Sequence, residues 1–293
     1  AYVIGNPAVQ AYADRIDIPT LPWRLGFALG AVPALLILWI RMSIHEPESW
    51  EAARDRSRQE GGERMGVIKD LFAPGMARRT FVGVTLATVG LATFWGTHIY
   101  GRNVLLAAAQ DRLVEREAAG ENLDDASRAE LFEAHRFTLK RWEMLGMFLV
   151  TTGGGLGLLG FGPLCQRFGR RKAFLMYHLG GLVSALILFQ AVQGIAAVTV
   201  FLPIFGFLTL GMHAGYAIYF PELYPTRLRG TGAGFCFNGG RILVPLVLLA
   251  SGLLQRNAGF SEQDAASLLS GLFVIGAMVL LVAPETKGQE LPE

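Results

Sequence analysis

Long stretches of this sequence carry no charged side chain at all. Between Ala173 and Pro221 there is no Asp, Glu, Lys or Arg, and the same holds for Thr80–Gly101, Met144–Gln166 and Ala265–Pro284. Charged residues make up 17% of the 293 residues, below the roughly 25% that is usual in a soluble domain. Because each uncharged stretch reaches the ~20 residues that cross a bilayer, we predict that they are transmembrane segments.

Backbone polar groups inside a bilayer need partners within the chain, so these segments are predicted to be helices. The longest stretch has room for two spans. A shorter apolar stretch, Leu25–Ile40, lies between Trp23 and Arg41, which suit the two membrane interfaces. Thr231–Gln255 is uncharged except for Arg241. The predicted fold is an all-α membrane protein, and a soluble all-helical core is the disfavoured alternative. The seven predicted spans are 23–44, 80–101, 142–164, 173–193, 196–220, 231–255 and 265–283.

The predicted orientation follows from Lys and Arg in the loops, which favour the cytoplasmic side. If the first span runs from outside to inside, the cytoplasmic side holds 41–79, 167–172, 227–229 and Lys287. The segment 102–141 then lies outside with seven cations and eight acids, which a long translocated loop tolerates. We therefore predict a multi-pass protein of the cell (inner) membrane.

Four short motifs lie at the predicted helix ends. They are EPESW at 46–50, GPLCQRFGRR at 162–171, PELYPTRLRGTG at 221–232 and PETKG at 284–288. Together with PWRLGFALGAVPAL at 22–35, they resemble the motifs of the major facilitator superfamily, in particular its sugar-porter and metabolite–proton symporter branch. The resemblance covers nearly the whole chain, in the order that the family has. One departure is Gln166, where the family's motif has Asp.

The resemblance implies the major facilitator fold, with about seven transmembrane helices in this chain: the sixth helix and the C-terminal six-helix bundle. We expect the family's first five helices to lie outside this sequence. The predicted parts are an external loop with the end of a preceding helix at 1–22, the last helix of the N-terminal half at 23–44, the central cytoplasmic loop at 45–79, and the bundle at 80–293 with an external helical insert at 102–141. The insert is predicted to form two short amphipathic helices with a break at Gly120 and Asn122.

Charged residues of the motifs are predicted to form a latch on the cytoplasmic side. A transporter that rocks between two states needs contacts that close in one state and open in the other. We expect Glu222 to pair with Arg167 or Arg171, and Arg229 to complete a network with Glu285. Solvated loop charges are the alternative, and Gln166 removes the carboxylate that in the family engages a helix N-terminus or an arginine. The predicted latch residues are Arg167, Gly169, Arg170, Arg171, Glu222, Arg229 and Glu285.

Polar side chains inside the predicted spans are the candidates for substrate binding, because polarity at membrane depth is costly and usually functional. Arg241 lies about ten residues into its span, and Asn238 is one helical turn earlier on the same face. This pair is predicted to clamp an anionic or polar substrate; a structural ion pair with a helix outside this sequence is the alternative. For the His and aromatic candidates, ordinary packing is the alternative. The predicted substrate-binding residues are Arg241, Asn238, His213, Tyr216 and Trp95.

The glycine-rich stretch 151–162 predicts a close approach between helices, and it lacks the Gly-Lys-Ser/Thr ending of a phosphate loop. Cys165 and Cys236 lie in a predicted cytoplasmic hairpin and inside a span, so no disulfide is expected. No catalytic or metal-ligating constellation stands out. We therefore predict no enzymatic activity, no cofactor and no metal.

The function that these features favour is a secondary-active transporter of a small polar metabolite by alternating access. An organic anion is favoured over a neutral sugar, with H+ as the coupling ion. The predicted partners are the substrate, the coupling ion and the lipid bilayer; no nucleic acid is expected, and the full-length form is predicted to be a monomer. A membrane-embedded enzyme and a non-transporting half of such a transporter are the alternatives.

Overall fold

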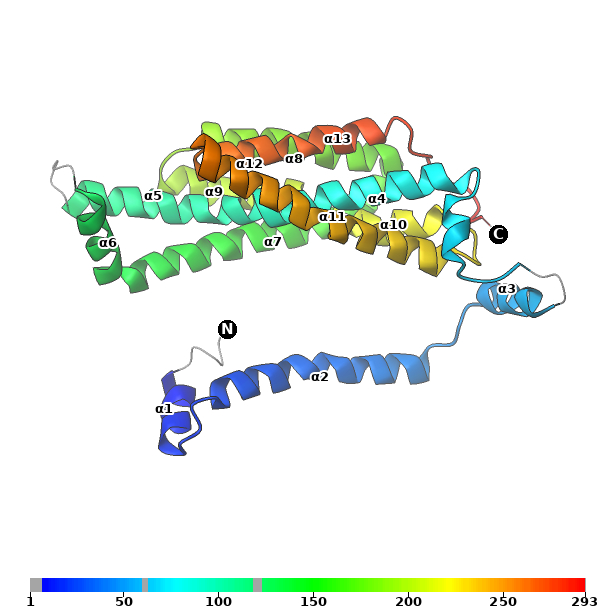
Figure 1. Cartoon of the computed structure of the whole chain (residues 1–293), viewed down its shortest axis with the longest axis horizontal. Helices are drawn as coiled ribbons and strands as arrows, with labels where there is room; N and C mark the ends of the chain where they lie inside the picture. The colour runs from blue at the N-terminus through cyan, green and yellow to red at the C-terminus, as the bar shows by residue number, and fades with distance from the viewer. Residues whose placement is uncertain (1–6, 60–62, 118–122, 293) are drawn as a thin grey trace. The chain divides into compact units, whose positions relative to one another are not determined.

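The computed structural model describes residues 7–59, 63–117 and 123–292, and this part of the chain contains helices and no strand (Figure 1). The chain forms two compact units, Ala1–Asp55 and Arg56–Glu293. The helices are α1 (Pro7–Arg15), α2 (Leu21–Ser43), α3 (Glu48–Arg58), η1 (Ile68–Phe72), α4 (Met76–Thr93), η2 (Phe94–His98), α5 (Ile99–Glu117), α6 (Asp125–Ala134), α7 (Arg136–Phe168), α8 (Arg170–Gln190), α9 (Ile195–Leu210), α10 (His213–Glu222), α11 (Arg229–Ala258), α12 (Glu262–Ser270) and α13 (Leu272–Val279). The predicted all-α class is therefore confirmed.

The first unit contains one helix of membrane-spanning length, α2. Pro22 stands in its first turn, where a missing backbone N–H leaves no hydrogen bond unmade. At the other end the amide of Ile44 donates to the carbonyl of Ile40 at 2.9 Å and closes the last turn. This 23-residue helix is apolar enough to cross a membrane, and it covers residues 23–43 of the predicted span 23–44.

The second unit is a bundle in which long helical stretches run alongside one another (Figure 1). Together with α2, the described residues contain six helices that are long and apolar enough to span a membrane. The other five are Met76–Glu117, Arg136–Phe168, Arg170–Gln190, Ile195–Glu222 and Arg229–Asn257. Residues 265–279 of the last predicted span, 265–283, lie in α12 and α13, which Gly271 joins with helical backbone angles. Each of these two helices is shorter than a span, so the count of seven stays a prediction.

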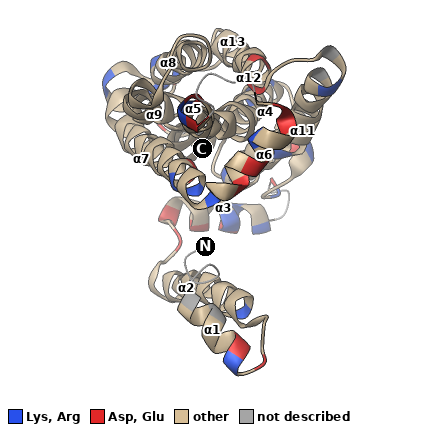
Figure 2. Cartoon of the chain, turned by 90° about the vertical axis from the view of Figure 1, so that its left-hand side faces the viewer, with Lys and Arg blue, Asp and Glu red and all other residues tan. Residues whose placement is uncertain are grey.

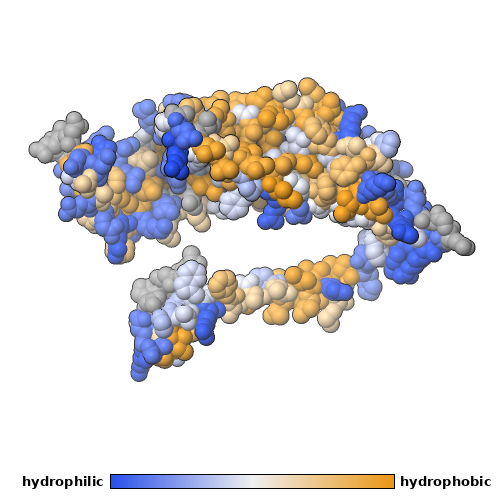
Figure 3. All heavy atoms as spheres, viewed as in Figure 1, coloured by the Kyte–Doolittle hydropathy of each residue, from blue (hydrophilic) through white to orange (hydrophobic). Residues whose placement is uncertain are grey.

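The surface of the second unit is what a bilayer requires. Hydrophobic residues form a broad band on the bundle, and hydrophilic residues lie toward its two ends (Figure 3). Seen from the end that carries α6, the outer helices are mainly uncharged (Figure 2). Large apolar side chains such as Phe148, Leu159 and Ile242 are exposed on the helices. An apolar surface of this extent is suited to lipid and not to water.

The glycine-rich stretch forms the predicted close approach, between α7 and α9. A Cβ atom added to Gly157 would lie 2.3 Å from the carbonyl oxygen of Phe207, and one added to Gly206 would lie 2.1 Å from that of Val150. Only helices without side chains at these positions can bring their backbones so near. In lipid, where no hydrophobic effect drives helices together, this packing is a main source of association.

The insert at 102–141 contains the end of α5 and the short helix α6, but α5 is the continuation of a long stretch and not the short helix that was predicted. The helix that begins at Met76 continues through η2 and α5 to Glu117 without leaving helical geometry. Only α6 is short; Asp124 caps it by accepting a hydrogen bond from the amide of Ser127 at 2.8 Å. The sequence before Glu117 is rich in Ala, Leu, Arg and Glu, which favour helix extension. The predicted break at Gly120 and Asn122 lies outside the described residues.

A pair of glycine substitutions tests the packing of α7 on α9. Gly157→Ala is expected to destabilise the protein by about 1–3 kcal/mol, because the added methyl group meets a backbone that cannot move aside. Gly155→Ala is the matched control, since nothing lies within 4 Å of an added Cβ there. The control is expected to be neutral or stabilising by up to ~1 kcal/mol through helix propensity. Thermal unfolding in detergent measures both, and equal losses would contradict this packing.

Candidate functional site

A charged network gathers where α8 begins. Gly169 connects α7 to α8 with φ of 94°, a backbone region that favours glycine. A Cβ atom at this position would also lie 2.7 Å from a carboxylate oxygen of Glu285. Gly169 is therefore needed both for the turn and for the approach of Glu285. We call Arg170, Glu222, Glu285 and Thr286 the latch network.

Glu285 caps the N-terminus of α8. Its two carboxylate oxygens accept hydrogen bonds from the backbone amides of Arg170 at 2.9 Å and Arg171 at 3.1 Å. The first amides of a helix have no partner inside the helix and carry its positive dipole end, so they attract a carboxylate. Burial raises the pKa of Glu285, but the backbone hydrogen bonds outweigh it and hold that pKa below its ordinary value.

The predicted pairing of Glu285 with Arg229 is therefore wrong. Arg229 donates instead to the carbonyl of Pro292 at 3.1 Å. The amides of Thr286 and Lys287 also donate to Glu285, so its oxygens are already engaged by neighbouring backbone. Gln166 has no carboxylate to offer the N-terminus of α8. Glu285, near the C-terminal end of the sequence, supplies that carboxylate instead.

Glu222 pairs with Arg170. The guanidinium makes a two-pronged contact, from Nε to Oε2 at 3.0 Å and from Nη2 to Oε1 at 2.7 Å. The hydroxyl of Thr286 donates to Oε2 at 2.6 Å. The two charged side chains are only 17% and 16% exposed, so the pair is shielded from competing water. A bidentate pair of this kind has both directional and charge-assisted strength.

The predicted partner of Glu222 was Arg167 or Arg171, and this assignment is wrong. Arg171 donates to the carbonyls of Leu280 at 3.0 Å and Leu281 at 3.4 Å, and Arg167 lies over the ring of Phe168. Successive residues of a helix point about 100° apart, so on the first turn of α8 only one arginine faces α10. The motif spacing alone does not say which one.

A second ion-pair cluster, which was not predicted, is centred on Arg227. Arg227 contacts the carboxylates of Glu63 and Asp70, and the amide of Gly66 donates to the Arg227 carbonyl at 2.9 Å. These contacts hold the segment before α4 against the turn before α11. The available signal was only that both segments belong to the predicted cytoplasmic side.

The predicted substrate-binding residues do not form one site. Arg241 and Asn238 are exposed on α11. Trp95 is 52% exposed in η2. Tyr216 is 4% exposed, and its hydroxyl donates to the carbonyl of Leu86 inside the bundle at 2.9 Å. His213 packs edge-on against Tyr216, with ring centres 5.2 Å apart. Arg241 and Asn238 thus face outward, whereas Tyr216 serves the packing of α10 on α4.

Arg241 has a distinct environment for a charged residue. It lies near the middle of α11, and its side chain makes no hydrogen bond or ion pair with the part of the chain that the structure describes. Asn238 donates to the carbonyl of Gly234 in its own helix at 2.9 Å. Arg241 is therefore a cation near the middle of this helix that is available to an anion.

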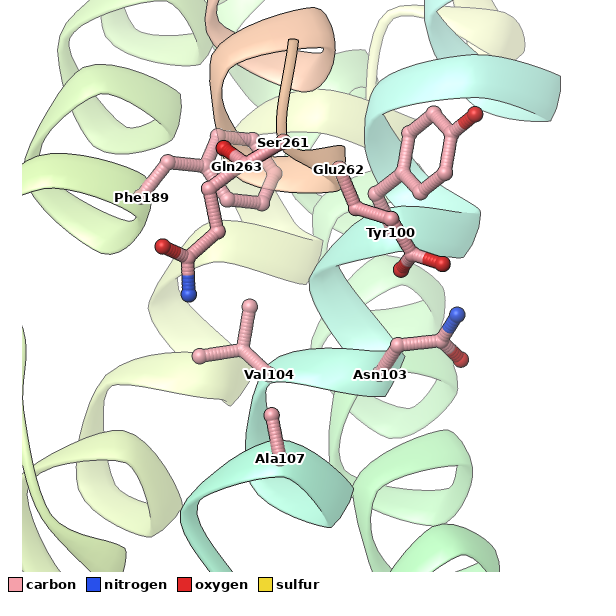
Figure 4. A pocket seen from close by; sticks show the side chains of 8 residues that line it. All are labelled: Tyr100, Asn103, Val104, Ala107, Phe189, Ser261, Glu262 and Gln263. Atoms are coloured by element: carbon pink, nitrogen blue, oxygen red, sulfur yellow. The ribbon is translucent and has the colours of Figure 1, made fainter. Parts of the chain in front are cut away.

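A hollow at the α5 end of the bundle was not predicted. It lies between α5, the end of α8 and the start of α12, and Figure 4 shows the side chains that line it. Its volume is about 230 Å³, and a larger neighbouring groove of about 890 Å³ shares Val104, Phe189 and Gln263 with it. Among the described residues, no group of three or more His, Cys, Asp or Glu side chains is placed to hold a metal ion.

These features define a class: a multi-pass membrane protein with a helical bundle and a charged network at one end of it. The chain is 25% identical to a putative metabolite transport protein of Haemophilus influenzae over 94% of its length. It is 26% identical to the inner membrane metabolite transport protein YhjE of Escherichia coli over 92%, and 26% identical to the cis,cis-muconate transport protein of Acinetobacter baylyi over 87%. No family model matches the chain.

These relatives confirm the resemblance to metabolite transporters of the major facilitator type, and they agree with a location in the membrane. The chain spans 61%, 56% and 55% of the lengths of the Haemophilus, Acinetobacter and Escherichia proteins, respectively. It therefore corresponds to somewhat more than half of each of them.

A double-mutant cycle tests the pair in the latch network. Glu222→Gln and Arg170→Gln are each expected to lower the uptake rate and the thermal stability, and the double variant is expected to lose much less than the sum. The coupling energy should be about 1–3 kcal/mol, as for hydrogen bonds between charged groups. Arg171→Gln is the matched control and should combine additively with Glu222→Gln. Stronger coupling of Glu222 to Arg171 than to Arg170 would refute the pairing.

The pH dependence of stability tests the role of Glu285. Because the folded-state pKa is lowered, the stabilisation is complete above the ordinary carboxyl pKa of 4.5 and is lost as the pH falls through the lowered value. Glu285→Gln is expected to cost about 1 kcal/mol at neutral pH, and the difference from wild type should shrink below pH 4.5. Glu290→Gln, in the exposed segment after α13, is the control and should not change the stability at any pH. A constant difference between wild type and Glu285→Gln would contradict the capping role.

Proposed function

We propose that this chain is part of a secondary-active transporter that moves a small organic anion together with a proton by alternating access. The side chain of Arg241 carries this proposal. The fold and the relatives give the transporter class, and the chemistry of Arg241 gives the class of substrate.

A cation in the middle of a membrane span needs compensation. Placing an arginine there costs at least ~2.5 kcal/mol on insertion scales. The uncharged stretches Met144–Gln166, Ala173–Pro221 and Ala265–Pro284 provide no carboxylate at membrane depth. A compensating anion therefore comes from outside this bundle, and we favour the substrate as its source. The guanidinium is a planar fork that suits a carboxylate.

One of the three relatives has a name that supports an organic anion as the substrate class. The Acinetobacter relative is named for transport of cis,cis-muconate, and the other two are named only for metabolites. A carboxylate substrate fits both that name and the chemistry of Arg241.

The latch network supports alternating access. It joins the start of α8, the end of α10 and the segment that contains Glu285 and Thr286. Ion pairs and hydrogen bonds at helix ends can separate without unfolding any helix, as a rigid-body transition requires. In this proposal the network closes one side of the transporter and opens when the bundle moves.

Substitution of Arg241 tests the substrate assignment. In the full-length protein, Arg241→Lys should raise the apparent substrate constant by about tenfold or more, because lysine keeps the charge but loses the fork. Arg241→Ala should abolish uptake. The measurement is uptake of labelled cis,cis-muconate, benzoate, glucose and myo-inositol into proteoliposomes. Arg256→Lys, at the end of the same helix, is the matched control and should behave as wild type.

Two results would count against the proposal. Unchanged kinetics in Arg241→Lys, with a neutral sugar as the best substrate, would overturn the anion assignment. No uptake of any metabolite by the wild type would favour the non-transporting alternative.

A further inference from the structure

Two long helical stretches of the bundle are interrupted near their middles, and the interruptions contact each other. The stretch Met76–Glu117 contains the π-helix η2, and the stretch Ile195–Glu222 is broken between α9 and α10 at Gly211 and Met212. Phe94 of η2 packs against His213, with ring centres 5.7 Å apart. Short π-helical segments inside α-helices are frequent at functional sites, and irregular backbone at membrane depth is tolerated only where protein or a cavity surrounds it.

The break fixes the orientation and the tautomer of His213. In a continuous helix the amide of Ala214 would donate to the Leu210 carbonyl, but here it donates to Gly211 at 3.3 Å. The released Leu210 carbonyl lies 3.0 Å from Nδ1 of His213. A carbonyl oxygen only accepts, so Nδ1 carries the hydrogen and Nε2 of the neutral ring has a free lone pair. This Nε2 atom is buried and has no hydrogen-bond partner among the described residues.

The neighbouring polar groups are already engaged with each other. The hydroxyl of Thr209 donates to the Phe205 carbonyl at 2.7 Å, so at 3.2 Å from Nδ1 of His98 it acts as the acceptor. The ring of Phe94 packs against both histidines, at 5.2 Å from His98 and 5.7 Å from His213. His98 is thus held in place by Thr209, whereas Nε2 of His213 has a lone pair to offer.

The other titratable groups around His213 cannot supply a counter-charge. α10 packs against α4, α7, α8 and α11. No carboxylate lies in the uncharged parts of α4, α7 and α8, and the hydroxyl of Tyr216 is bonded to Leu86. The remaining titratable groups at span depth on these helices are Cys165 of α7, His178 and Tyr177 of α8, and Cys236 and the exposed Arg241 of α11.

We propose that His213 is the residue that takes up the coupled proton, with Nε2 as its acceptor. This inference rests on the proposed proton-coupled transport and assigns the residue that performs it. A proton passes from water to the Nε2 lone pair and gives an imidazolium, which returns the proton to water on the other side. The site suits a proton because aromatic rings flank His213 closely on two sides.

Protonation also explains why proton and anion would move together. An imidazolium in a water-poor interior with no carboxylate nearby is costly. An anionic substrate in the transporter lowers that cost, and the charged imidazolium in turn favours the anion. Each ligand then raises the affinity for the other by the same factor, which is the linkage that symport needs.

His178 offers a matched control. Its Nδ1 also lies near a backbone carbonyl, that of Phe174 at 2.7 Å, and its Nε2 is also buried with no partner among the described residues. His178 differs in its surroundings, because it belongs to the uninterrupted helix α8 and its ring lies against Phe273 and Gly276 of α13. A comparison of the two histidines therefore separates the interrupted site from burial of an imidazole in general.

The experiment compares His213→Gln and His178→Gln in the full-length protein reconstituted in liposomes, using the best labelled anion of the uptake panel. With the membrane potential clamped at zero, one coupled proton gives up to about tenfold accumulation per unit of pH difference. His213→Gln should lose this accumulation and still exchange internal unlabelled anion for external labelled anion, because exchange needs no net proton movement. His178→Gln should keep the pH-driven accumulation.

Each contrary result has a distinct meaning. If His213→Gln accumulates the anion like wild type, or if it loses exchange as well as accumulation, the proton assignment is wrong. Wild-type uptake that does not depend on the pH difference would overturn the proton assignment while leaving the transport function intact. Absence of any wild-type uptake would instead remove the proposed function itself.

Discussion

The rest of this structure depends on one constraint: backbone N–H and C=O groups in a bilayer must find partners within the protein. The uncharged stretches satisfy it by folding into helices, and their side chains then present an apolar surface along the bundle (Figure 3). Helices so formed gain little from hydrophobic burial against one another, so close backbone contact at Gly157 and Gly206 becomes important. Each departure from regular helix is costly under the same constraint, which makes the interruptions at η2 and at Gly211 informative.

The fold could largely be predicted because the segments that must satisfy this constraint are recognisable in the sequence as long uncharged stretches. An uncharged stretch long enough to cross a bilayer satisfies its backbone groups by forming a helix. Six of the seven predicted spans correspond to helices of membrane-spanning length among the described residues. The insert shows the limit of this reasoning. Its composition predicts helix, but composition does not tell a separate helix from an extension of the span before it, so the continuation of Met76–Glu117 was missed.

The latch network could be predicted as a set of residues but not as a set of contacts. The motifs place arginines and carboxylates at helix ends, yet the partner of Glu222 depends on the direction in which each side chain leaves the first turn of α8. Arg170 and Arg171 point about 100° apart on the helix, so their order in the sequence does not say which of them faces Glu222. The capping role of Glu285 depends on where the segment after α13 passes, which no local pattern encodes. The contact of His213 Nδ1 with the Leu210 carbonyl likewise depends on the interruption after α9, which the uncharged sequence does not reveal.

α10 connects the two parts of the proposed mechanism. It begins with His213 at the helix break and ends with Glu222 in the latch network. A helix of 10 residues is about 15 Å long and too short to bend appreciably, so a displacement at one end reaches the other. Protonation at His213 and opening of the Glu222–Arg170 pair would therefore act on the same rigid element, and this is the physical means by which the proton site and the latch can influence each other.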